Sequence, residues 1–443
     1  MAATLIFHYW PVCNCVPSLQ PDLKTDAAIT NCNMPNLNMW TAITWCNIII
    51  KNLAEPDLLA RGFKAGHTFL ALMIMGSSNG IHMNGGKGER SYANNSLFQK
   101  KLMLKAKPIL EETVTILYQD SSPKCIKVAD LGCSVGPNTL LVTSNIIDIV
   151  DATCTCMNIE LPTFQFYLND LFGNDFNTIF KSLPDFYAKL VQEKGQKFGS
   201  CFINATPGSF HGRLFPDDSV DFFHSANSLH WLSQDPLMGL SKEAKELNKG
   251  NCHIVSTSPP DVHKAYQKQF QQGFKLFLKS RSEELVPGGA MVLVLPCTCK
   301  TETLSKSLWE VISLTLNDMF LEGLIEEEKL DSFNIPTYEP TIEEIRDLIK
   351  EQESLFVQRL EVFTVARDEG ISERGDYCFL DGGIRAEFIA TYTRAAMEPI
   401  LSAKFEVQVI NELFIRFQRK LVQLMEVEKF ETANVIISMT KVV

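Results

Sequence analysis

Two acidic residues stand where predicted strands end, and both could bind the hydroxyl or amino groups of a ligand. Asp130 follows the apolar run 125–129 and precedes the glycine turn 132–136, while Asp170 follows the apolar run 164–168. A carboxylate at the carboxyl end of a parallel strand can accept two hydrogen bonds from a ribose diol. An acidic residue at a strand end is also ordinary turn and helix-cap chemistry, so either residue alone leaves both roles open.

The glycine turn separates two classes of cofactor. Its Gly-x-x-x-Gly spacing differs from the Gly-x-Gly-x-x-Gly fingerprint of dinucleotide-binding folds. Pro137 at the start of the following helix leaves fewer backbone amides for a pyrophosphate. The turn therefore disfavours a NAD-dependent oxidoreductase and suits a ligand such as S-adenosylmethionine, which carries ribose hydroxyls and an amino group.

Polar and aromatic residues follow the next two predicted strands, 200–205 and 220–225. They are Ser209, Phe210, Asn227, His230 and Trp231. A lone histidine or tryptophan at such a place is more often part of the core than of a site. Because ligands bind outside the carboxyl ends of the strands in a doubly wound sheet, we expect these side chains to lie near both carboxylates.

The apolar periodicity predicts an α/β sheet that positions these residues. Helices are expected over 97–117 and 261–284, and a mostly helical block runs from about 305 to 430. The seven expected strands begin at 125, 164, 200, 220, 253, 291 and 435. We expect residues 1–74 to be a poorly structured extension, 75–300 with 431–443 to bind the cofactor, and 301–430 to form a cap that closes the pocket.

Composition excludes several classes of protein. The net charge of −11 argues against nucleic acid as a partner. The 13 cysteines lack zinc-finger spacing and are typical of reduced thiols in a cytoplasmic protein. The longest apolar runs are too short to span a bilayer, and no basic segment of a secretory signal precedes them. We therefore expect a soluble, cytoplasmic protein that binds neither nucleic acid nor membrane.

From residue 83 onward the chain resembles the SABATH methyltransferases of plants, which methylate small carboxylic acids or, in the caffeine and theobromine synthases, purine nitrogens. The resemblance rests on five motifs in the same order. They are Met-Asn-Gly-Gly-Lys-Gly with Ser-Tyr-Ala at 83–93, Asp-Leu-Gly-Cys-Ser-Val-Gly-Pro-Asn at 130–138, Leu-Asn-Asp-Leu at 168–171, Pro-Gly-Ser-Phe at 207–210 and Ser-Leu-His-Trp-Leu-Ser at 228–233. The first 74 residues or so lie outside it.

The resemblance implies a Rossmann-like seven-stranded sheet under an α-helical cap, a homodimer, and S-adenosylmethionine as methyl donor. By motif, the donor would be bound by Tyr92, Asp130, Cys133, Asn138, Asp170, Leu171, Ser209 and Phe210. The acceptor would be bound by Gln99, Asn227, His230 and Trp231. Some members are described with Mg²⁺, and the matching positions are Asn248, Asp331, Phe333 and Asn334.

The chemistry needs no obligatory catalytic side chain. The sulfonium methyl group is already activated, and a carboxylate is already a nucleophile, so the protein has to align the two in a dry pocket. A xanthine nitrogen must also lose its proton, which His230 is placed to accept or to orient.

The acceptor is the open question. The segments 183–190, 199–201 and 297–300 resemble the coffee-type xanthine methyltransferases, and the Gly-Arg-Arg typical of carboxyl methyltransferases is absent. Gln99 with Trp231, in contrast, is the pair that holds a carboxylate in salicylate-type members. We favour a xanthine nitrogen; the alternatives are a carboxyl methyltransferase that makes methyl esters of salicylate-, benzoate- or jasmonate-type acids, and a non-catalytic protein that binds a metabolite.

Overall fold

The computed structural model describes residues 82–195, 200–237, 248–298, 306–371, 381–428 and 430–442. All of them belong to the unit Thr68–Val443. The extension predicted for residues 1–74 lies outside the described residues.

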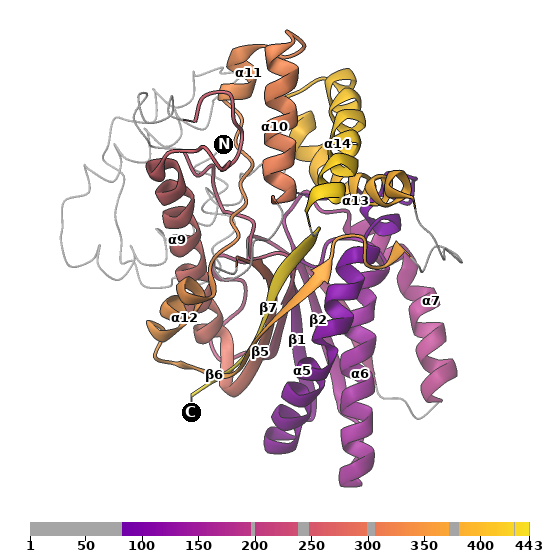
Figure 1. Cartoon of the computed structure of the whole chain (residues 1–443). Helices are drawn as coiled ribbons and strands as arrows, with labels where there is room; N and C mark the ends of the chain where they lie inside the picture. Colours follow the sequence, from indigo (N-terminus) through magenta and orange to yellow (C-terminus); the bar gives the residue numbers. More distant parts are fainter. Residues whose placement is uncertain are drawn as a thin grey trace, which may run out of the picture. The chain divides into compact units, whose positions relative to one another are not determined.

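One mixed sheet organises this unit, with the strand order β3-β2-β1-β4-β5-β7-β6 (Figure 1). The strands are β1 (Cys125–Leu131), β2 (Thr163–Asp170), β3 (Cys201–Pro207), β4 (Val220–Ala226), β5 (Leu285–Cys297), β6 (Leu355–Ala366) and β7 (Glu431–Lys441). Strands β1 to β5 run parallel, and β7 is antiparallel to both of its neighbours, β5 and β6. The order reverses between β1 and β4, and this switch point is where an open α/β sheet binds its ligand.

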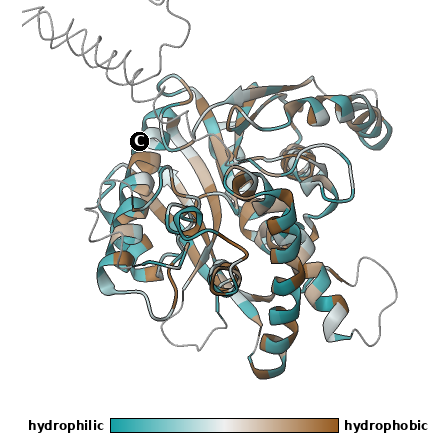
Figure 2. Cartoon of the chain, turned by 90° about the horizontal axis from the view of Figure 1, so that it is seen from above, coloured by the Kyte–Doolittle hydropathy of each residue, from teal (hydrophilic) through white to brown (hydrophobic). Residues whose placement is uncertain are grey.

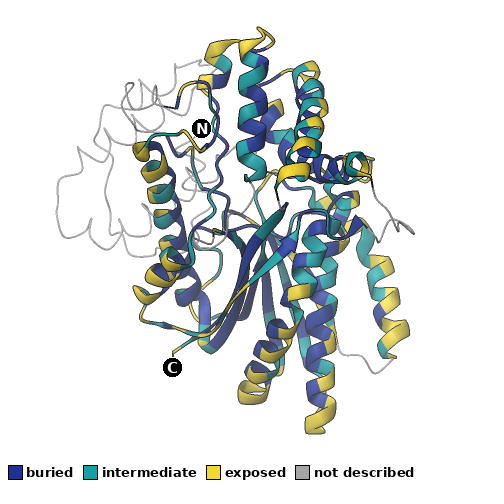
Figure 3. Ribbon diagram, in the orientation of Figure 1, coloured by how far each residue is buried: buried dark blue, intermediate teal, exposed yellow. Residues whose placement is uncertain are grey.

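The central strands are apolar on both sides because helices cover both faces of the sheet. Alternate residues of 290–295 in β5 enter two different hydrophobic clusters. One cluster lies under α5 (Leu97–Ser121), α6 (Pro137–Met157) and α7 (Phe176–Lys194), and the other under α9 (Pro260–Glu284) and α12 (Ile342–Lys350). Figure 3 shows the strands buried between helices whose outer faces are exposed.

A third hydrophobic cluster forms the helical cap. Its helices are α10 (Leu308–Leu321), α11 (Glu327–Asp331), α13 (Gly382–Ser402) and α14 (Val407–Val427). They gather beyond one end of the strands (Figure 1), and polar and apolar stretches alternate along the helices, as one buried face requires (Figure 2). The cluster also includes Phe98 and Trp231 from the sheet domain, so the cap closes directly over the predicted acceptor residues.

The predicted fold class, a Rossmann-like sheet of seven strands with a helical cap, is confirmed. The prediction assigned one of the seven strands to the wrong residues. Residues 253–256 form no strand, because their backbone N–H groups bond elsewhere: the Val255 N–H donates to the Ser258 hydroxyl at 3.0 Å, and the Ser256 N–H donates to Glu310 at 3.0 Å. The seventh strand is β6, which lies inside the block predicted to be helical. As an edge strand with mostly half-exposed side chains, β6 lacks the apolar run that identified the central strands.

Helix α6 is the one described helix that is long and apolar enough to cross a membrane, and half of its apolar window is buried inside the protein. It packs against α5 and β2, as expected of a core helix.

Candidate functional site

A pocket lies over the carboxyl ends of the parallel strands and extends along this edge of the sheet. It encloses about 1330 Å³, part of it open to solvent. Gly132 after β1, Asp170 of β2, Ala226 of β4, Thr432 of β7 and Arg367 after β6 all line it. Since neighbouring strands are about 4.8 Å apart, the lining spans roughly 24 Å from β2 to β6, five strand spacings. The pocket is therefore long enough for two ligands side by side.

Asp170 is fixed at the β2 end of the pocket by two backbone amides. One carboxylate oxygen accepts from the Ser134 N–H at 2.7 Å, and the other from the Leu171 N–H at 2.8 Å. Burial raises the pKa of Asp170 to about 6, although both hydrogen bonds act to lower it. The remaining lone pairs of an immobile carboxylate can accept from the two hydroxyls of a ribose.

The glycines of the turn allow the chain to pack without side chains at two close approaches. Gly132 has φ +74°, and a Cβ there would overlap Ser228. Gly136 has φ +112°, and a Cβ there would lie 2.6 Å from the Cα of Ala93. Ala93 is the neighbour of Tyr92, which lines the pocket, so the second contact packs this segment against the turn.

The predicted donor-binding residues fall into two groups. The pocket is lined by Tyr92, Asp170, Leu171, Ser209 and Phe210.

The other three predicted donor residues bond inside the protein. The Asp130 carboxylate accepts from the His224 ring at 2.7 Å, the Cys133 thiol donates to the Ser134 carbonyl, and the Asn138 amide donates to the Ser96 carbonyl at 2.9 Å. These bonds hold the turn in place from the side of the protein interior. Direct contact of the three residues with the donor stays a prediction.

All four predicted acceptor residues, Gln99, Asn227, His230 and Trp231, line the pocket. Three of them present a buried polar atom with no hydrogen-bond partner among the described residues: Gln99 Oε1, Asn227 Nδ2 and His230 Nδ1. Buried polar groups are nearly always paired, so unpaired atoms that meet in one pocket indicate a ligand with polar groups of its own.

Burial keeps His230 uncharged. It lowers the pKa of His230 to about 3, so the ring is neutral at physiological pH. The ring lies 5.5 Å from the Trp231 ring and stacks at 6.4 Å with Trp309 of α10, measured between centroids. These three rings form one wall of the pocket, suited to a flat aromatic ligand.

Sequence reasoning missed five further residues of the pocket, of which Trp309 and Tyr392 belong to cap helices and Phe98 to α5. Phe98, Trp309, Glu339, Arg367 and Tyr392 also line the pocket, and Phe98 stacks on Tyr392 at 5.1 Å. None belongs to a motif or follows a strand that was recognised. Arg367 is set apart as a buried charge and Glu339 as a half-buried one, and burial is not visible in a sequence.

The residues predicted to bind Mg²⁺ do not form a prepared cation site. Asn248 Oδ1 accepts from the Ser258 hydroxyl at 2.9 Å, and Asp331 Oδ1 accepts from the Gly250 N–H at 2.9 Å. The Asn334 amide donates to Asp235, and Phe333 packs its ring against Phe405. Only one of the four is a carboxylate, whereas Mg²⁺ prefers several free oxygen ligands. Among the described residues, no group of three or more His, Cys, Asp or Glu side chains could hold a metal.

Comparison with known proteins agrees with this geometry. Residues 78–442 match the family described as SAM dependent carboxyl methyltransferase. A probable caffeine synthase of Coffea canephora is 42% identical over 374 residues, which cover 82% of this chain and 97% of that protein. A benzoic acid/salicylic acid carboxyl methyltransferase of Petunia hybrida is also 42% identical, over 365 residues that cover 82% of this chain and 98% of that protein. The solved structure of a loganic acid methyltransferase with SAH superposes with a TM-score of 0.70 at 30% identity and covers 82% of this chain and 99% of that one.

Proposed function

Because the chain belongs to the SABATH family of S-adenosylmethionine-dependent methyltransferases, we propose that its acceptor is a small plant metabolite of the xanthine-alkaloid type, methylated on a ring nitrogen. The observation that carries this choice is the set of unpaired polar atoms among aromatic walls. Gln99 offers an acceptor, Asn227 a donor, and the neutral His230 ring an atom that can take either role. A xanthine ring presents N–H and C=O groups that would pair with such a neutral, mixed set.

The donor would bind at the β2 end of the pocket. Asp170 would accept from the ribose hydroxyls, and Phe210 would pack on the adenine. The acceptor nitrogen attacks the methyl carbon of the sulfonium, the carbon–sulfur bond breaks, and its electron pair stays on sulfur. The nitrogen becomes positively charged and its proton acidic, so even a weakly basic His230 could take up the proton. The aromatic walls would align the acceptor and exclude water.

A carboxylate acceptor is the second candidate, and the pairing of Gln99 with Trp231 favours it. In that reaction a carboxylate oxygen attacks the methyl group, and no proton has to leave. The two readings share the donor site and differ only in the acceptor.

A transfer assay with labelled S-adenosylmethionine tests the choice. Methylxanthines, xanthosine, salicylate, benzoate and jasmonate would be offered to the full chain separately. Label on a purine supports the proposal, and label only on an acid replaces it with the second candidate. Bound donor with no product from any of them would favour a binding protein without turnover.

The remaining expectations are also proposals. We propose a homodimer, to be checked by light scattering of the full chain, and a cytoplasmic location, which the free thiols of all seven described cysteines support. The Mg²⁺ site stays a prediction, and no step of the reaction above depends on it.

A further inference from the structure

We infer that Glu339 and Arg367 bind a polar group of the acceptor at the end farthest from the methyl donor. This group would donate a hydrogen bond to Glu339 and accept one from Arg367. The inference rests on the proposed methyl transfer and specifies which acceptors the site selects.

The strand order places Arg367 far from the proposed donor site. Arg367 follows β6, the last strand of the sheet order, whereas Asp170 ends β2, near the other edge. Asn227, which follows β4, lies between them in that order. A donor over β2 and β1 and an acceptor over β4 and β5 would leave Arg367 beside the outer end of the acceptor.

Arg367 is a buried cation held in one orientation. The residue is only 4% exposed, and its guanidinium carbon lies 4.7 Å from the centre of the Phe430 ring. Nη1 donates to the Lys306 carbonyl at 2.7 Å, the one hydrogen bond of this guanidinium within the described part of the chain. A guanidinium has five N–H donors, so most of them remain for a ligand.

Glu339 is tied to the acceptor residues themselves. The Tyr338 N–H donates to the His230 carbonyl at 2.9 Å. Burial raises the pKa of Glu339, and the nearby Trp309 side chain acts to lower it. Trp309 in turn packs against Trp231, with ring centroids 5.7 Å apart. Glu339 therefore lines the pocket beside the aromatic wall that would hold the acceptor ring.

The two charges influence each other but do not touch. Each changes the pKa of the other, yet no ion pair within 4.0 Å joins them among the described residues. Arg367 is buried and Glu339 is half-buried. Opposite charges that are withdrawn from water but separated leave part of their desolvation cost uncompensated. A ligand group inserted between them would satisfy both, which an apolar group cannot do.

The charges also define the chemistry of that group. A purely anionic group would be repelled by Glu339, and a purely cationic group would be repelled by Arg367. A neutral group that both donates and accepts fits the pair, such as the N–H/C=O edge of a xanthine or a phenolic hydroxyl.

The test measures binding without turnover, by calorimetry on the full chain saturated with S-adenosylhomocysteine. The first ligand pair is 7-methylxanthine and 1,7-dimethylxanthine. They differ only at N1, which carries a hydrogen in the first and a methyl group in the second. The second pair is 4-hydroxybenzoate and benzoate, which differ by a hydroxyl far from the carboxylate. We expect the wild-type protein to prefer the first member of at least one pair by about tenfold or more, because a site built for a polar group rejects its apolar analogue.

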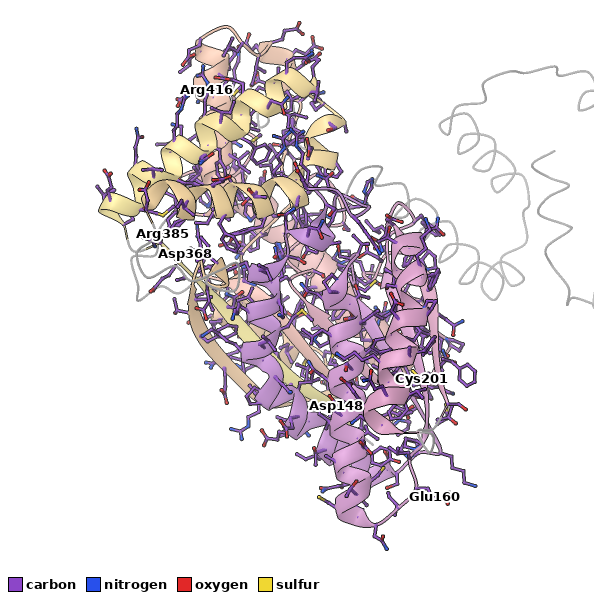
Figure 4. All side chains as sticks on the ribbon, turned by 90° about the vertical axis from the view of Figure 1, so that its right-hand side faces the viewer. Asp148, Glu160, Cys201, Asp368, Arg385 and Arg416 are labelled. Carbon is purple, nitrogen blue, oxygen red and sulfur yellow. The ribbon has the colours of Figure 1, made fainter. Side chains whose placement is uncertain are left out.

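The double variant Glu339→Met/Arg367→Met removes both charges together and leaves neither one unpaired. Its preference should fall to about onefold. The matched control is Asp368→Met/Arg385→Met, which removes the neighbouring ion pair of 2.5 Å (Figure 4). Neither control residue lines the pocket, so the preference should persist there. Unchanged affinity for S-adenosylhomocysteine verifies folding; if the double variant loses that affinity, Glu339→Gln and Arg367→Lys must each reduce the preference severalfold.

The outcomes separate this inference from the proposed acceptor. A preference found only in the benzoate pair, and lost in the double variant, supports the inference while replacing the xanthine proposal. No preference in either pair, or one that survives Glu339→Met/Arg367→Met, overturns the inference.

Discussion

Replacing Asp170 by Asn should weaken donor binding and, at the same time, stabilise the empty protein. Burial raises the pKa of this carboxyl from 3.8 to about 6, so above pH 6 the folded protein holds a carboxylate that it disfavours. The difference is worth about 3 kcal/mol, since one pKa unit corresponds to about 1.4 kcal/mol. Asparagine removes this cost but turns its NH₂ group toward one of the two backbone N–H donors, losing about 1 kcal/mol. We therefore expect a net gain of about 2 kcal/mol at pH 7.5.

The donor should respond in the opposite direction. Two charge-assisted hydrogen bonds to the ribose, at about 1.5 kcal/mol each, amount to about 100-fold in the dissociation constant. Calorimetry with S-adenosylmethionine measures the affinity, and denaturant unfolding at several pH values measures the stability. The raised pKa means that the stability gain over wild type should be full above pH 6 and vanish below about pH 4, where both states are protonated.

The matched control is Asp221→Asn. Burial also raises the pKa of Asp221, which accepts from the Lys127 N–H at 2.7 Å, but Asp221 does not line the pocket. Its donor affinity should stay at the wild-type value. Asp170→Asn with unchanged donor affinity would refute the assignment of the ribose site, and a loss of stability at pH 7.5 would refute the account of burial.

Four further predictions concern the same site and the residues that precede the family match. Donor affinity of the wild-type protein should fall as the pH drops below about 6, because Asp170 then binds a proton; a calorimetric titration that stays flat to pH 5 would contradict this. Because the pKa of His230 is about 3, this ring should not titrate between pH 6 and 8. The pH dependence of the rate at saturating donor should therefore be the same in wild type and His230→Asn over that range. Gly132→Ala should destabilise the protein by about 2–3 kcal/mol in denaturant unfolding, because its φ of +74° is strained for alanine and the added Cβ overlaps Ser228; the matched Gly323→Ala, at φ +77° with open space, should cost less. A chain that starts at Met75 should still bind S-adenosylmethionine, because the family match begins at residue 78; loss of soluble protein would show that the first residues are needed.

The pocket residues that we propose for the donor were predictable because they depend on local sequence. Apolar runs and the turn-forming residues between them predict a strand, a glycine turn and a carboxylate at the end of the next strand. Asp170, Ser209 and Phe210 accordingly line the pocket as predicted.

The acceptor half was only partly predictable, because long-range packing assembles it. Trp309 lies on a cap helix and Arg367 follows an edge strand that the apolar pattern did not reveal. The pocket joins them to His230, which is more than 70 residues away along the chain, through contacts that no local pattern encodes. The same limit explains why residues 253–256 were mistaken for a strand: they are apolar enough, but they bond to the cap and not to the sheet.

The proposed placement of the two ligands along one edge of the sheet has an evolutionary consequence. The donor end is built largely from backbone, through the amides that hold Asp170 and the glycines that permit close packing. The acceptor end is built from exchangeable side chains that project from the cap and the strand ends. Mutations can therefore change which metabolite is methylated without dismantling the machinery that supplies the methyl group. Such a division permits descendants of one ancestor to diverge toward purines or acids, and the two relatives that are both 42% identical to this chain carry names from each class.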